Sequence, residues 1–132
     1  MLAPRVLILQ PDHWPRALLR AELREAGYDA VGATTPAEAN AYAVAEPGRG
    51  PVRLVIVDEQ ALSRDGTRSL ERLLARHRSP ATVLIRSASA PVPPGTWTDI
   101  LRRPLTIGDI VDSVKRHLPL PAGSRLPLDP PQ

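Results

Sequence analysis

The sequence of 132 residues predicts a single α/β domain in which helices cover both faces of a parallel sheet. The length suits one hydrophobic core. Short apolar runs without polar alternation, such as RVLIL at 5–9 and LVIVD at 54–58, are typical of strands buried on both faces. Amphipathic segments of helical period separate these runs. This alternation of strand and helix predicts parallel strands joined by right-handed crossovers.

The apolar period and the end signals place each element in turn. Strands are predicted at residues 5–9, 28–33, 52–58, 81–88 and 99–104. Helices are predicted at residues 13–26, 36–46, 63–77 and 107–118. Asp12 or His13 is expected to cap the first helix, and Gly27 to end it. Thr35 and Thr106 are expected to cap the second and the last helix, because each is followed three residues later by an acidic residue.

The connection between the fourth and fifth predicted strands shows no helical pattern. Pro91, Pro93 and Pro94 fall within four residues, and each proline inside a helix costs roughly 3 kcal/mol. We therefore expect the helix of this connection to be missing or shortened. The segment 119–132 holds five prolines and no periodicity. The sequence thus predicts a domain at 1–118 and a proline-rich tail or linker at 119–132.

The composition excludes several classes of protein. There is no cysteine, which excludes disulfides and thiolate metal sites. The apolar runs are too short to span a membrane and the N-terminus lacks the pattern of a signal peptide, so we expect a cytoplasmic protein that binds no membrane. The net charge is only +3, and the arginines are scattered among acidic residues with few aromatics. This pattern argues against a nucleic-acid interface.

Candidate site residues follow from the predicted topology. Ligands of parallel α/β sheets bind beyond the carboxyl ends of the strands. Four segments of this chain reach that edge: 10–12, 58–65, Ser87 with the residues after it, and 102–104. The crevice between them is expected to be lined by Gln10, Pro11, Asp12, Asp58, Ser87, Arg103 and Pro104.

These segments carry a resemblance to a known family. In LVIVDEQALSRDG, Asp58 is followed seven and eight residues later by Asp65 and Gly66. Together with REAGYDAVGATTPAEA and DILRRPLTIGDIVDSVKRHL, this stretch resembles the receiver domain of bacterial two-component response regulators. The resemblance covers residues 5–118. It implies a flavodoxin-like, doubly wound sheet of five parallel strands in the order 2-1-3-4-5, here with the fourth helix missing or shortened.

The resemblance also implies a chemistry. Asp58 matches the phosphoacceptor aspartate of the family, and Ser87 matches the hydroxyl that binds a phosphoryl oxygen. In the family, two acidic residues after the first strand hold Mg²⁺, and a lysine after the fifth strand pairs with the phosphoryl group. Pro104 matches a family proline whose preceding peptide bond is commonly cis.

Two parts of this chemistry are replaced. Gln10 and Pro11 stand where the acidic pair belongs, and neither is a good ligand for a hard divalent cation. Arg103 stands in the place of the lysine, and its planar fork suits an ion pair with Asp58 itself. We therefore expect no catalytic residue, no cofactor and no metal site. Only Asp12, Asp58 or Asp65 could contribute a ligand to a metal site.

Three functions fit these observations. The first is a pseudo-receiver that acts in signal transduction by binding a partner protein without phosphorylation and without enzymatic activity. The alternative is a receiver that a histidine kinase phosphorylates on Asp58 as part of a phosphorelay, with Mg²⁺ as cofactor. The third is a flavodoxin-like protein that binds or converts a small ligand. This third function lacks the glycine-rich loop that it would need after the first strand.

Several side chains have both a structural and a functional interpretation. Asp58 can also be read as a structural carboxylate at the end of a strand, and Ser87 as a serine that bonds the backbone of a turn. Trp14 and Trp97 could each pack in the core or form a surface for a partner protein. Arg86 is expected to extend to water, and the histidines His13, His77 and His117 are expected on the surface. A monomer or a weak homodimer is expected.

Overall fold

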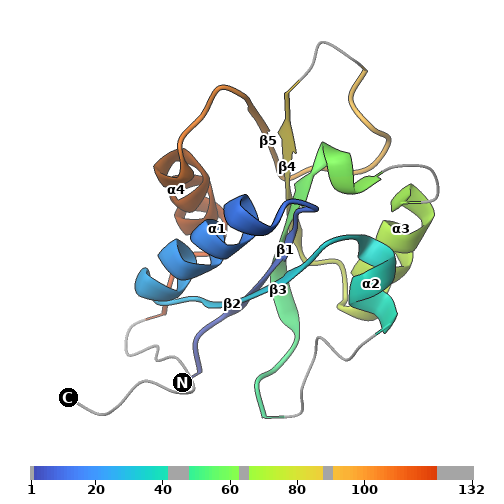
Figure 1. The fold of residues 1–132 in the computed structure, drawn as a ribbon. Helices are drawn as coiled ribbons and strands as arrows, with labels where there is room; N and C mark the ends of the chain where they lie inside the picture. Colours follow the sequence, from blue (N-terminus) through green and yellow to red (C-terminus); the bar gives the residue numbers. More distant parts are fainter. Residues whose placement is uncertain (1, 42–47, 63–65, 88–90, 122–132) are drawn as a thin grey trace.

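A computed structural model describes residues 2–41, 48–62, 66–87 and 91–121 of the chain (Figure 1). Five strands form one sheet of order β2-β1-β3-β4-β5, in which every pairing is parallel. The strands are β1 (Arg5–Leu9), β2 (Asp29–Ala33), β3 (Val52–Asp58), β4 (Ala81–Arg86) and β5 (Asp99–Arg102). The predicted fold class and strand order are confirmed.

Helices cover both faces of this sheet. They are α1 (His13–Glu25), α2 (Pro36–Ala41), α3 (Gly66–Arg76) and α4 (Ile107–His117), with a short 3₁₀ turn η1 (Glu59–Leu62) after β3. Figure 1 shows α1 and α4 on one side of the sheet and α2 with α3 on the other. None of the helices described is long and apolar enough to cross a membrane. The tail from residue 122 onward lies outside the described residues, so the domain boundary at 118 stays a prediction.

The alternation of side chains along each strand divides the core into two layers. On β1, Val6 and Ile8 face α1 and α4, whereas Leu7 and Leu9 face α2 and α3. All four are fully buried. Because both faces are covered, the strands show no polar alternation, which is why their runs were recognisable in the sequence. Each such side chain contributes about 1.5–3 kcal/mol of burial free energy.

Hydrogen bonds at the helix ends explain where the helices begin. Thr106 accepts a hydrogen bond from the Asp109 backbone N–H, and the Asp109 carboxylate accepts one from the Thr106 N–H, a complete capping box. Thr35 accepts a hydrogen bond from the Glu38 backbone N–H at 3.1 Å. The first helix is different: Asp12 occupies the N-cap position but makes no side-chain cap bond. The expected Asp12 cap is therefore absent.

The connection from β4 to β5 contains no helix in its described part, residues 91–98. Trp97 folds back against the core layer of α2 and α3, and its indole N–H donates to the Pro93 carbonyl at 3.0 Å. The Thr98 N–H donates to the Thr82 carbonyl, and the Thr82 hydroxyl donates to the Thr96 carbonyl, both at 2.8 Å. An irregular loop bonded to β4 thus stands in place of the fourth helix, as the three prolines predicted.

Two charged or polar side chains lie where the sequence did not place them. His77 was expected on the surface but is 5% exposed, and its Nδ1 accepts a hydrogen bond from the Val52 N–H at 3.4 Å. Arg86 was expected to extend to water but is 4% exposed. It is the last residue of β4, on the same face as Leu84 and Thr82, where it lies close to Glu59 of η1. Both predictions were wrong because segments distant in sequence lie against these side chains: Val52 of β3 at His77 and Glu59 of η1 at Arg86.

Candidate functional site

Asp58, at the end of β3, is fully buried, with 0% of its surface exposed. Its Oδ2 accepts a hydrogen bond from Gln10 Nε2 at 2.7 Å and forms an ion pair with Arg103 Nη2. Its Oδ1 accepts a hydrogen bond from the Gln60 backbone N–H at 3.0 Å. Both carboxylate oxygens are therefore occupied by donors from three different segments. A buried carboxylate needs such partners to remain charged.

The Gln10 corner that follows β1 is built around the two ends of one side-chain amide. The Gln10 Nε2 donates to Asp58, while its Oε1 accepts a hydrogen bond from the Asp12 backbone N–H at 2.8 Å. The Gln10 backbone N–H donates to the Ala33 carbonyl at 3.0 Å. Arg16 of α1 donates to the carbonyls of Gln10 and Pro11, at 2.8 and 3.3 Å. The corner therefore presents a fixed amide donor to Asp58.

Arg103 directly follows β5 and reaches across to β3. Its backbone N–H donates to the Arg86 carbonyl at 2.8 Å, which extends the sheet pairing by one step beyond the strand. The peptide bond between Arg103 and Pro104 is cis, as the resemblance implied. The Arg103 side chain is 35% exposed, so its ion pair with Asp58 joins a buried carboxylate to a half-buried guanidinium. The positive charge that balances the buried Asp58 carboxylate is thus supplied by a side chain of the protein itself.

Ser87 follows β4, and its polar groups are directed to a residue that the sequence did not single out. Its backbone N–H and its hydroxyl both donate to Oε1 of Glu59, at 2.8 and 2.9 Å. The backbone hydrogen bond from Ser87, followed by its hydroxyl and by nearby Arg86 and Arg103, lowers the pKa of Glu59 below its usual value. Glu59 is adjacent to Asp58 in sequence, and this adjacency was the only signal that could have identified it.

A small cavity of about 60 Å³ lies beside the Asp58 carboxylate. Its polar walls are Gln10, Asp58 and Arg103. The remaining lining is apolar and comes from Ile8, Leu9, Pro15, Leu19, Ile56, Ile85, Ile107 and Ile110. Since about 10–15 Å³ of such volume is enough for one water, the cavity has room for a few waters. A small-molecule ligand does not fit in this cavity.

The residues present do not fit a magnesium ion. Mg²⁺ requires oxygen ligands in octahedral geometry and is usually held by carboxylates. Pro11 has no side-chain donor, the Gln10 amide oxygen is engaged by Asp12, and Asp12 is exposed and does not line the cavity. Within the described residues, no group of three or more His, Cys, Asp or Glu side chains is arranged to hold a metal. Asp65 lies outside the described residues.

Comparison of the sequence with protein-family models and with curated proteins gives no match. The structure is similar to that of a response regulator receiver protein from Pseudomonas putida, with a TM-score of 0.66, 20% identity, and coverage of 88% of this chain and 98% of that one. It is also similar to a CheY-like receiver domain from Methanospirillum hungatei, with a TM-score of 0.66, 17% identity, and coverage of 86% and 92%. The fold is that of a receiver domain.

Similar structures carry more than one description. An adenylate cyclase structure from Rhodopirellula baltica matches with a TM-score of 0.70 and 16% identity, over 88% of this chain and 87% of that one. At these identities the likeness concerns the receiver fold. Because one fold can carry many functions, the function depends on the residues at the strand ends.

The receiver fold places the two tryptophans on different sides of the sheet. Trp14, in the first turn of α1, is 72% exposed. Trp97 is partly buried against the layer of α2 and α3, and α1 covers the opposite face. Trp14 and Trp97 therefore do not form one continuous surface, and Trp14 is the more accessible of the two.

Proposed function

We propose that this protein is a pseudo-receiver that acts in signal transduction by binding a partner protein, without phosphorylation of Asp58 and without enzymatic activity. The observation that supports this proposal is the set of donors around the Asp58 carboxylate, from Gln10, Arg103 and Gln60. Together they give Asp58 the role of a structural ion-pair partner rather than a nucleophile.

The chemistry of phosphoryl transfer explains why these donors matter. A carboxylate attacks phosphorus through a free oxygen lone pair, and its negative charge must be screened while the phosphoryl group approaches. At Asp58 the oxygen Oδ2 already accepts from both Gln10 and Arg103. Phosphorylation at Oδ2 would break these contacts, and phosphorylation at Oδ1 would displace the Gln60 N–H. No carboxylate of the Gln10 corner lines the cavity to bring a metal in exchange. The resting state is therefore stabilised relative to a phosphorylated one.

The second candidate is a receiver that is phosphorylated on Asp58. The position of Asp58 at the end of β3 favours it, since this position agrees with the family pattern. It requires that Asp12 or Asp65 become a ligand of Mg²⁺. A cytoplasmic place of action and a monomeric or weakly dimeric protein are expected under either candidate.

A titration with Mg²⁺ and beryllofluoride distinguishes the two candidates, because beryllofluoride mimics the acyl phosphate of a receiver. Amide chemical shifts of Asp58, Ser87 and Arg103 provide the measurement, and Trp14 fluorescence provides a second signal. Under the pseudo-receiver proposal these amides show no saturable change at millimolar Mg²⁺. Saturable shifts centred on Asp58 and Ser87 would overturn the proposal and establish the phosphorylated receiver.

A further inference from the structure

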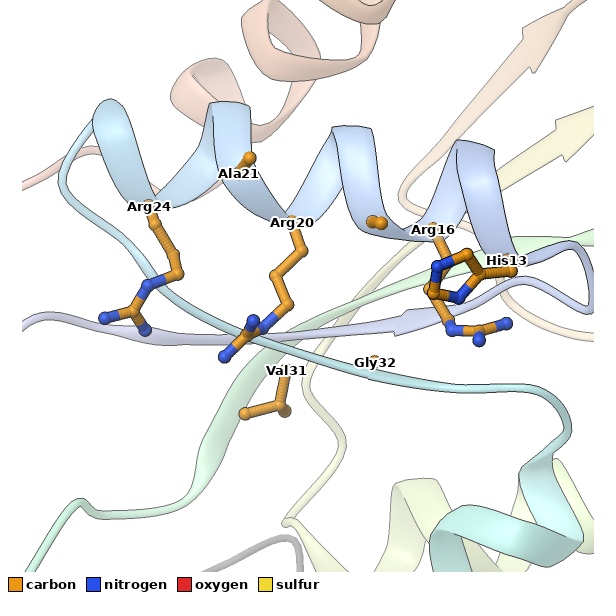
Figure 2. A pocket seen from close by; sticks show the side chains of 8 residues that line it. His13, Arg16, Arg20, Ala21, Arg24, Val31 and Gly32 are labelled. Carbon is orange, nitrogen blue, oxygen red and sulfur yellow. The ribbon is translucent and has the colours of Figure 1, made fainter.

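Three arginines project from one side of α1 toward the edge of the sheet (Figure 2). Arg16, Arg20 and Arg24 follow one another at intervals of four residues, and with His13 they line an open groove of about 670 Å³ between α1 and β2. Small residues complete the lining of the groove: Ala17, Ala21, Val31 and Gly32. β2 is an outer strand of the sheet. This arginine groove shares no residue with the cavity beneath Asp58.

Backbone carbonyls hold two of the arginines of the groove, Arg16 and Arg20, in place. The stem of Arg16 lies directly over Gly32, because a Cβ at Gly32 would approach Arg16 Cγ to 2.9 Å. Arg16 Nη1 donates to the Gln10 carbonyl, and Arg20 Nε donates to the Ala30 carbonyl at 3.1 Å. A guanidinium has five N–H donors, so these contacts leave others for a ligand. Side chains that are already ordered lose less entropy on binding.

The charge of the arginine groove is not balanced by acidic groups on α1. Glu22 and Glu25 of this helix are exposed and do not line the groove. The carboxylate nearest to Arg24 is that of Asp29, whose Oδ1 lies 3.7 Å from Arg24 Nη1. Asp29 is buried and also pairs with Arg5, at 3.5 Å, and with Arg49. Its single negative charge is shared among three arginines, so the groove remains positive.

We propose that the arginine groove binds an extended acidic segment of a partner protein, with carboxylates at alternate positions meeting Arg20 and Arg24. Residues four apart on a helix are separated by about 6 Å along its axis. Alternate residues of an extended chain are separated by about 6.6 Å and point to the same side. An extended segment therefore presents its carboxylates at nearly the spacing of the arginines, and each guanidinium can bind a carboxylate with two hydrogen bonds.

The lining of the groove decides between an extended segment and other ligands. An amphipathic helix would need hollows for large apolar side chains, whereas the apolar walls here are alanine, valine and glycine. A single-stranded nucleic acid would need aromatic surfaces for base stacking, and His13 is the only ring among the residues that line this groove. This inference rests on the proposed function in that it names the partner's binding segment.

The test uses the full chain and a fluorescein-labelled peptide in which glutamate alternates with threonine. We expect saturable binding by fluorescence anisotropy at low ionic strength, where charges are least screened. The double variant Arg20→Gln with Arg24→Gln is expected to weaken binding about tenfold. Arg68→Gln with Arg72→Gln is the matched control, because it removes the same charge at the same spacing from exposed positions of α3. It is expected to weaken binding less than about twofold.

A second variant keeps the arginines in place and tests the groove in another way. Ala21 is exposed and lines the groove, so Ala21→Glu introduces a carboxylate there without removing a contact of Arg20 or Arg24. We expect it to weaken binding by about the same factor as the double variant. Circular dichroism of each variant shows whether the fold is retained, and Ala21→Glu decides the question if the double variant unfolds.

Four results would overturn the inference. They are the absence of saturable binding, equal losses in the groove and control variants, equal binding of a peptide whose glutamates are gathered at one end, and equal competition by a single-stranded oligonucleotide of the same charge. None of these results bears on Asp58. Conversely, a beryllofluoride response would overturn the proposed function and leave the peptide measurement valid. The two pockets share no lining residue, and the variants leave Arg16, which donates to the Gln10 carbonyl, unchanged.

Discussion

Arg103 and Asp58 form an ion pair across the carboxyl ends of β5 and β3, with the intervening strand β4 between them. The pair joins two positions that are 45 residues apart in sequence. It fixes the positive charge of the site on a side chain instead of a diffusible ion. The site therefore resembles a receiver crevice in which the partner of the carboxylate is always present.

Removing Arg103 should destabilise the protein. Deleting one member of a fully buried ion pair costs about 3–5 kcal/mol. Because Arg103 is 35% exposed, we expect Arg103→Ala to lower the free energy of unfolding by about 2 kcal/mol. Urea denaturation measures this change. In an Asp58→Asn background the same substitution should cost less than about 1 kcal/mol, and an equal cost in both backgrounds would show that the ion pair does not stabilise the fold.

Restoring acidic residues should create a response to magnesium. We expect the triple variant Gln10→Asp, Pro11→Asp and Arg103→Lys to be less stable than the wild type without metal, because a new carboxylate would stand close to Asp58 in place of the Gln10 amide. Millimolar Mg²⁺ should then raise its melting temperature, as any ligand that binds only the folded state does. Arg103→Lys alone is the control. An identical response to Mg²⁺ in that control would contradict the interpretation of Gln10 and Pro11.

His77 should make stability depend on pH below neutrality. Burial, with a smaller effect of nearby Arg76 and Arg5, lowers the pKa of His77 below its usual value of 6.5. As pH falls through this value, the unfolded chain binds a proton that the folded chain does not, so stability decreases by at most about 1.4 kcal/mol per pH unit. His77→Gln should flatten this dependence as pH falls below neutrality, as followed by urea denaturation. A slope unchanged by the substitution would assign the pH dependence to other groups.

Ser87 should control the ionisation of Glu59. Hydrogen bonds from the Ser87 backbone N–H and hydroxyl, together with Arg86 and Arg103, lower the pKa of Glu59 from 4.5. The ionised carboxylate thus contributes stability above this value, and the contribution is lost as pH falls through the lower folded pKa. In Ser87→Ala the backbone bond remains, so the pKa should rise only part of the way back. Carbon-13 NMR of the Glu59 carboxyl group measures it, and Ser87→Thr, which keeps the hydroxyl, should leave it low.

The sequence was informative where a local pattern carried the signal. Apolar runs located the strands, the three prolines indicated the missing helix, and the strand-end rule brought Gln10, Asp58 and Arg103 to one edge. Boundaries were less certain: the fourth strand ends at Arg86 and the fifth at Arg102, earlier than predicted. The last register pair of these two strands is Arg86 with Arg102, and a pairing between strands depends on tertiary contacts.

The errors concern side chains whose surroundings are made by distant segments. Glu59 binds Ser87 from 28 residues away, and His77 is buried through its contact with Val52, 25 residues away. Residue type alone places histidine and arginine at the surface more often than in the interior. No local pattern in one sequence reveals that Val52 of β3 will bond to His77 or that η1 will lie beside Arg86. Such contacts are visible only in the folded structure.

The hydrogen bond from Arg20 to the Ala30 carbonyl also has a consequence for the outer edge of the sheet. Asp29 and Ala33 make their backbone bonds toward β1, so the alternation of the strand turns the Ala30 carbonyl to the outside. An outer strand with bare backbone groups is a template for intermolecular sheets and aggregation. Arg20 covers this acceptor with a charged side chain. The helix that carries the arginine groove thereby leaves one fewer backbone group of the β2 edge open to pairing with another chain.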